Sequence, residues 1–207
     1  FIITVMTKYE IWNLVLNAFI AVGLFGVVLI ALFGNWIRNK LFPAQLDIEI
    51  LDKNGELTVM DNGHKVIYYH IHVVNKKPVV VKNCMLYLKS IQKLEAGGNF
   101  IDIPVSVTPR YIWSPAETTP EAVDIIRSHT ADFGYVMDSS TVFKPTVTPI
   151  LKSFRGNLEH HETFRYYIQI VAENYNPKHL FGIEVTWDGL WPEDLGQMYK
   201  HLIIKRI

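Results

Sequence analysis

The sequence has few of the residues on which cross-links and cofactor sites depend. Its 207 residues include one cysteine, Cys84, which excludes an intrachain disulfide and any cysteine-rich metal site. Charged residues make up only 19%, and 20 basic residues balance 20 acidic ones. Domains that bind nucleic acid normally carry a basic excess, so this balance argues against nucleic acid as a partner. Hydrophobic residues make up 49%, which excludes a disordered chain.

Common motifs of catalysis and nucleotide binding are also missing. The chain has no Gly-x-Ser-x-Gly nucleophile elbow and no glycine-rich phosphate-binding pattern. Cys84 lies in an alternating apolar segment, where a buried small hydrophobic residue is expected more often than a nucleophile. The sequence therefore predicts a protein that is not an enzyme and needs no cofactor.

One long apolar run stands near the beginning of the chain. Residues 11–33 form a stretch of 23 positions without a charge. As a helix it would be about 35 Å long, enough to cross a hydrocarbon core of about 30 Å. Trp12 and Trp36 flank it, and indole rings favour the depth of the lipid headgroups. We predict a transmembrane helix, because a buried core helix this long would normally keep a polar face.

A cleaved signal peptide is the other interpretation of this run. Its apolar region would be unusually long, and residues 34–38 do not form a small-residue cleavage site. We therefore expect residues 1–42 to be an anchor that is retained. Met6 is a candidate natural start, because Met-Thr-Lys-Tyr-Glu leads directly into the run.

Charges beside the run predict its orientation. Lys8 is the only base before it, and Glu10 accompanies that lysine. Arg38 and Lys40 follow the run with no acid nearby. Because cytoplasmic flanks carry an excess of Lys and Arg, we predict a single-pass protein whose second domain lies in the cytoplasm.

Two amides lie inside the run. Asn13 and Asn17 are four residues apart, so they share one helix face, which Ala21 continues. Amides in hydrocarbon usually bond to a neighbouring helix, which predicts other membrane subunits or a second copy as partners. The alternative is that both amides lie near the headgroups and are hydrated, which is the simpler reading for Asn13.

Residues 43–207 are predicted to form one β-domain. Pro43 ends the helix, and about 165 residues follow, enough for a single core. Period-two alternation, typical of half-buried strands, marks residues 67–73, 164–170 and 183–188. Further strands are predicted at 46–50, 56–60, 79–89, 99–105, 132–136 and 202–206. Two short helices are predicted at 120–127 and 192–201, and 106–163 is expected to be an irregular, proline-rich excursion. Many short strands with little helix indicate a mainly β fold, an antiparallel sandwich.

Residues 68–88 carry a first resemblance. They read Tyr-Tyr-His-Ile-His-Val-Val-Asn-Lys-Lys-Pro-Val-Val-Val-Lys-Asn-Cys-Met-Leu-Tyr-Leu. This resembles the strand–turn–strand of bacterial Ig-like, adhesion-type modules, with Asn75 opening the turn and Asn83 before the second strand. Lys77 departs from the usual glycine. We expect Asn75 to tolerate left-handed geometry, and both amides to bond to turn backbone.

The whole chain resembles a family of uncharacterised prokaryotic proteins. These have one N-terminal span, a basic Trp-Ile-Arg exit and a domain that closes on Trp-Asp-Gly-x-Trp, which is matched here by Trp187, Asp188, Gly189 and Trp191. The resemblance implies the architecture and no reaction. An acid between two indoles could stack on a sugar, but the simpler interpretation is a structural turn whose tryptophans pack on the domain.

His70 and His72 are the weak candidates for a metal site. They share one strand face at a spacing that metal ligands use. His160 or His161 could add a third ligand. The alternative is a pair of surface or cross-strand histidines, which we favour because no acidic residue follows at the expected spacing.

The sequence leaves three functions open. The first is a non-catalytic, membrane-anchored interaction module, an accessory or scaffolding subunit of a larger membrane complex. The alternative is a membrane-anchored sensor or effector whose β-domain binds a small ligand, which predicts a closed polar pocket. The third is a metal enzyme or hydrolase using His70 and His72.

Overall fold

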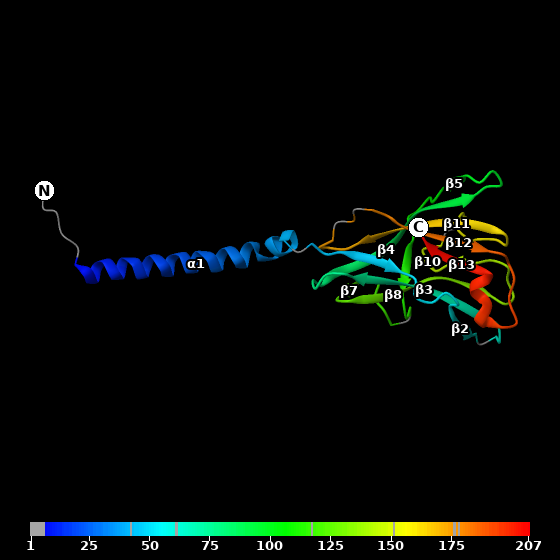
Figure 1. The fold of residues 1–207 in the computed structure, drawn as a ribbon, viewed down its shortest axis with the longest axis horizontal. Helices are drawn as coiled ribbons and strands as arrows, with labels where there is room; N and C mark the ends of the chain where they lie inside the picture. Colours follow the sequence, from blue (N-terminus) through cyan, green and yellow to red (C-terminus); the bar gives the residue numbers. More distant parts are fainter. Residues whose placement is uncertain are drawn as a thin grey trace. The chain divides into compact units, whose positions relative to one another are not determined.

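The computed structural model describes residues 7–41, 43–60, 62–116, 118–150, 152–175, 177 and 179–207, without the side chains of residues 35 and 37–41. Two compact units divide at Pro43/Ala44: residues 1–43 and 44–207. The first holds one helix, and the second holds the strands (Figure 1). Met6, the candidate start, lies outside the described residues.

The helix α1 spans Lys8–Leu41 and begins at a capping box. The backbone N–H of Thr7 donates to Glu10 Oε2 at 2.7 Å, and the backbone N–H of Glu10 donates back to Thr7 Oγ1 at 3.4 Å. Its segment Lys8–Gly34 is long and apolar enough to span a membrane, and no part of the most apolar stretch is buried against the chain. Such a surface is unfavourable in water, so it needs lipid or another protein to cover it.

The second unit is mainly β and antiparallel, as predicted. The principal strands are β1 Leu46–Glu49, β3 Lys65–Asn75, β4 Val81–Leu94, β6 Arg110–Trp113, β8 Ser128–Met137, β11 Glu162–Val171, β12 Phe181–Trp187 and β13 Leu202–Arg206. Shorter strands are β2 Glu56–Val59, β5 Phe100–Ile103, β7 Val123–Ile125, β9 Lys144–Pro145 and β10 Val147–Thr148.

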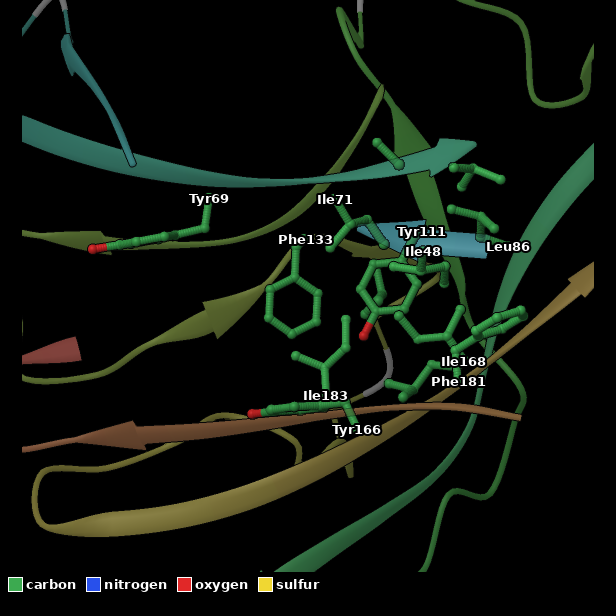
Figure 2. Close-up of a cluster of buried hydrophobic side chains, with 14 of the residues drawn as sticks. Ile48, Tyr69, Ile71, Leu86, Tyr111, Phe133, Tyr166, Ile168, Phe181 and Ile183 are labelled. Carbon is green, nitrogen blue, oxygen red and sulfur yellow. The ribbon is translucent and has the colours of Figure 1, made fainter. Parts of the chain in front are cut away.

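Hydrogen bonds link the principal strands in the order β1-β3-β8-β6-β4-β11-β12-β13. The two end strands, β1 and β13, lie close together. Arg206 Nη1 of β13 donates to the carbonyl oxygen of Ile48 at 3.1 Å and lies 2.5 Å from Asp47. The series of hydrogen-bonded strands therefore curves round so that its first and last strands meet. Side chains from its two halves meet in one core (Figure 2).

Large apolar side chains fill this core. Figure 2 shows Tyr69 and Ile71 of β3 on one side of the cluster, and Tyr166 and Ile183 of β11 and β12 on the other. Phe133 of β8 lies between them, with its ring centroid 5.7 Å from that of Tyr166 and nearly perpendicular to it. The predicted alternation is confirmed in β3 and β11, where apolar residues are buried and their neighbours are half-buried, whereas in β12 Glu184 is buried together with Ile183 and Val185.

Two expectations about the middle of the chain are wrong. Residues 120–127 do not form a helix: Val123 and Ile125 are buried in β7, which pairs with Val81 and Cys84 of β4. Two buried β-branched residues at period two favour a strand more than Pro120 favours a helix start. The described residues between 106 and 163 contain five whole strands, β6 to β10, and the start of β11; β8 lies between β3 and β6.

The last predicted helix forms as a 3-10 helix, η1, over Leu195–Lys200. Asp194 precedes it, and its side chain accepts a hydrogen bond of 3.0 Å from the backbone N–H of Gly196. Met198 is fully buried and Leu195 packs against the core, so two apolar side chains hold this short element in place.

Candidate functional site

A polar groove lies on the outer face of β3 and β8. Tyr68, His70 and His72 alternate with buried residues along β3, as the sequence predicted. The pairing register of β3 with β8 shifts between Tyr69 and His70, so that His70 lies opposite Asp132. This irregularity places an imidazole beside a carboxylate on the same face of the sheet.

Two carboxylates contact His70. Its Nδ1 lies 3.0 Å from Asp132 Oδ1, and its Nε2 lies 3.4 Å from Glu56 Oε2 of the neighbouring strand β2. Asp132 raises the pKa of His70 above the ordinary 6.5, partial burial opposes this shift, and Glu56 adds to it. The protonated form of His70 is therefore stabilised at this site.

His72 has a different environment. Its Nδ1 lies 3.2 Å from Thr130 Oγ1, and burial, followed by the neighbouring His70, lowers its pKa. The two histidines thus have opposite pKa shifts on one strand face. His160 and His161 contact each other, with ring centroids 5.3 Å apart, and His161 has a left-handed backbone with φ of 59°. Within the described ranges, no three His, Cys, Asp or Glu side chains are arranged to hold a metal ion.

The groove around His70 has a volume of about 450 Å³ and is open to the surface. The rings of Tyr68 and Tyr135 lie in it with centroids 5.5 Å apart. Its other lining residues are Glu56, Thr58, Met60, Val66, His70, Ser114, Pro115, Ala116, Asp132, Met137 and Thr146. This volume is within the range of small-molecule sites, so the groove could accept a ligand of modest size.

Sequence reasoning found His70 but not its two acidic partners. Asp132 lies 62 positions along the chain from His70, and the register shift in β3 decides that the two meet. Glu56 meets His70 because β2 folds back on β3 through the turn that contains Gly63, whose φ is 82°. No local pattern in the sequence marks either carboxylate.

The Trp-Asp-Gly-x-Trp segment forms a turn at the end of β12. Trp187 is buried, and its Nε1 donates to the carbonyl oxygen of Thr141 at 2.7 Å. Asp188 accepts a hydrogen bond from the backbone N–H of Leu190 at 2.8 Å and lies 2.8 Å from His201 Nδ1. Gly189 has φ of 86°, and Trp191 packs against the core. These contacts fit a structural role for the segment.

Of the two asparagines in the predicted turn, one bonds to turn backbone and the other has the left-handed backbone. The Asn75 side chain bonds to turn backbone, donating to the carbonyl oxygen of Val79 at 2.5 Å and accepting from the N–H of Lys77 at 3.1 Å. The left-handed residue is Asn83, with φ of 52°, and its amide bonds to the Glu173 carboxylate. The expected left-handed geometry of Asn75 is therefore wrong.

The residues predicted to anchor the chain in the membrane lie on an exposed helix. Trp12, Asn17 and Ala21 are exposed on α1, as is Trp36 near its end. The side chains of Arg38 and Lys40, which predict the orientation, lie outside the described part of the chain. The lone Cys84 is buried in the β-domain, and burial raises the pKa of its thiol to about 12, so it is not a ready nucleophile.

Comparison with known proteins adds no further constraint. No protein-family model and no curated protein matches the chain. The Ig-like assignment and the resemblance to the prokaryotic family therefore stay predictions from the sequence.

Proposed function

We propose that this chain is a non-catalytic, membrane-anchored interaction module, an accessory or scaffolding subunit of a larger membrane complex. The observation that carries the proposal is α1. Its 27-residue segment Lys8–Gly34 is apolar throughout the stretch that would span the bilayer, and its own chain leaves that stretch uncovered. A lipid bilayer and a neighbouring helix would supply the missing contacts.

Two features of the β-domain support a role in binding. Its core is filled by aromatic and branched side chains, so contacts with other molecules would be made on its surface. Its one cysteine is buried, and His70 is occupied by two carboxylates. The β-domain would thus be the part that holds partners on the cytoplasmic side, as Arg38 and Lys40 predict.

Mass measurement of the full chain in a mild non-ionic detergent tests the proposal. We expect assemblies larger than one chain, formed with copies of itself or with co-purifying membrane proteins. Asn17→Leu should weaken them, because an amide in hydrocarbon loses its partner on the next helix. Asn13→Leu, on the same face but near the headgroups, is the matched control and should change them less. A strictly monomeric species without partners would contradict the proposal.

The groove around His70 favours a second candidate, a membrane-anchored sensor or effector of a small ligand. This function predicts a closed, polar-lined interior pocket, and the apolar and aromatic side chains that fill the core among the described residues count against that form of it (Figure 2). The open groove between Tyr68 and Tyr135 is the better place for a ligand. The discriminating observation is whether a small molecule binds there.

A further inference from the structure

The lining of the groove around His70 carries an excess of negative charge. Glu56 enters it from β2 and Asp132 from β8, on either side of the imidazole. No lysine or arginine stands among its described lining residues. With His70 protonated, the three groups sum to one negative charge; with His70 neutral, they sum to two. An anionic ligand would therefore be repelled in either state.

Asp132 is a largely buried carboxylate in the wall of the groove. The residue is only 8% exposed, and its Oδ1 is fully enclosed without a hydrogen bond of good geometry, although His70 Nδ1 lies 3.0 Å away. Thr146 Oγ1, in the same groove, is also enclosed and has no hydrogen-bond partner among the described residues. Both atoms are enclosed and not open to a ligand, so Asp132 acts on the groove mainly through its negative charge.

The rest of the lining is apolar and aromatic. Tyr68 and Tyr135 form a tilted pair, with an angle of 42° between their rings. Met60, Val66 and Met137 contribute apolar surface beside them. Aromatic faces attract cations through their quadrupole, and apolar walls favour a hydrocarbon body. Carboxylates and aromatic rings in one groove thus fit a cation carried on an apolar frame.

We propose that this groove binds an organic ammonium ion, whose charge lies by Glu56 and Asp132 and whose hydrocarbon body lies along Tyr68 and Tyr135. All of the groove's lining residues belong to the β-domain, so this proposal and the membrane-complex proposal can fail independently. It rests on the second candidate function, since it names the chemical class of that ligand.

Binding should compete with protonation of His70. A bound ammonium ion and an imidazolium would repel each other at the same two carboxylates. The other titratable groups near His70 are His72 on β3 and the phenols of Tyr68 and Tyr135, while Ser114, after β6, carries no charge. Affinity should therefore rise as the pH increases through the pKa of His70, and ligand should lower that pKa.

Calorimetry and NMR of the full chain in phosphatidylcholine nanodiscs test this. The probes are phenethylamine, phenethyl alcohol and phenylacetate, which share one frame and differ in charge. We expect phenethylamine to bind at least about tenfold more tightly than the other two at pH 8, as a charge-assisted contact requires. Its affinity should fall at pH 6, and His70→Gln should remove that dependence on pH.

Glu56→Gln provides the decisive variant, because Glu56 is an exposed side chain whose change leaves the core intact. It should weaken phenethylamine binding about two- to fivefold, as for an exposed ion pair. Glu95→Gln, an exposed carboxylate outside the groove, is the matched control and should leave the affinity unchanged. Equal binding of the three probes, no binding of phenethylamine, or an unchanged affinity in Glu56→Gln would overturn the proposal.

A further titration with Nα-acetyl-lysine amide, whose ε-ammonium is free, identifies the source of the ammonium group. Binding of phenethylamine alone points to a free amine. Preferential binding of acetyl-lysine amide, with phenethylamine still detectable, points to a lysine side chain of a protein. Both results support a site for organic ammonium ions.

Discussion

At the scale of single residues, the electrostatic surroundings of the histidines are the most informative feature, above all those of His70. Three histidines lie close to an aspartate: His70 with Asp132 at 3.0 Å, His64 with Asp138 at 3.1 Å and His201 with Asp188 at 2.8 Å. The contact with Asp132 raises the pKa of His70, and partial burial opposes this shift. Its titration is therefore the most direct test of the site geometry.

Asp132→Asn should lower the pKa of His70, because a neutral amide no longer stabilises the imidazolium while burial still opposes its charge. Glu56→Gln should lower it less, since that contact is longer and exposed. Following the His70 Cε1 resonance against pH checks both. A raised pKa stabilises the fold fully below about 6.5, and the stabilisation is lost as the pH rises through the folded value. Equal pKa values in the wild type and Asp132→Asn would contradict the contact.

Gly189 supports a second prediction for a single residue. Its φ is 86°, and an added Cβ would lie 2.5 Å from the Cβ of His160. Gly63 has a similar φ of 82° but open space around it. Gly63→Ala should therefore cost only backbone strain, about 1 kcal/mol, whereas Gly189→Ala should cost about 2–4 kcal/mol. Urea unfolding of both variants measures the difference, and equal losses would show that the close approach to His160 is unimportant.

At the scale of elements, one charged row ties three strands together. Glu184 of β12 is 8% exposed and forms ion pairs with Arg165 of β11, at 2.9 Å, and Lys205 of β13, at 2.7 Å. Burial by itself would raise the pKa of Glu184, but its hydrogen bonds with Lys205 and Arg165 outweigh this and lower it. These ion pairs help to hold β13 on the sheet, where it is hydrogen-bonded to β12.

Glu184→Gln should destabilise the β-domain by about 1–2 kcal/mol at pH 7, because two cations lose their shared carboxylate. The lowered pKa means that this stabilisation is present above the unfolded pKa and is lost as the pH falls through the folded value. The wild type and the variant should therefore converge in stability at low pH. Denaturant unfolding at pH 7 and at pH 3 checks this, with Glu95→Gln as a control expected to stay within about 0.5 kcal/mol. An equal difference at both pH values would contradict the role of the carboxylate.

Elements also show where sequence patterns fail. Alternation in residues 67–73 and 164–170 predicted β3 and β11 correctly, because burying one face of a strand imposes that pattern. Proline at 120 favoured a helix that does not exist, since Val123 and Ile125 find partners in β4 that lie about 40 positions away. A local sequence pattern predicts an element reliably when that pattern by itself creates the buried face. It is unreliable when pairing with a distant strand creates the buried face.

At the scale of the whole molecule, the chain joins an apolar helix to a β-domain whose own core is complete. The formal charge of zero is a sum over these unlike parts. The charges that predict the orientation of the chain are local ones, Arg38 and Lys40. They predict that the β-domain faces the cytoplasm, while α1 supplies the length and apolarity for one span.

Reversing both charges, Arg38→Glu with Lys40→Glu, should produce a mixed or inverted orientation, because Lys8 would become the dominant basic flank. Protease digestion of sealed membrane vesicles, with detection of the β-domain, measures the fraction on each side. Lys76→Glu and Lys77→Glu in the β-domain serve as a matched double charge reversal that should leave orientation unchanged. An unaltered orientation after reversal at Arg38 and Lys40 would mean that another feature directs insertion.

The sequence by itself determined the apolar helix, most of the strands and the exposed face that carries His70, because each follows from the spacing of apolar residues over a few positions. Only the tertiary structure decided what His70 contacts. Asp132 and Glu56 reach it through a register shift in β3 and through the return of β2, and pairing between strands is set by the global packing of the core. The groove is thus a product of strand register, which no short stretch of sequence encodes.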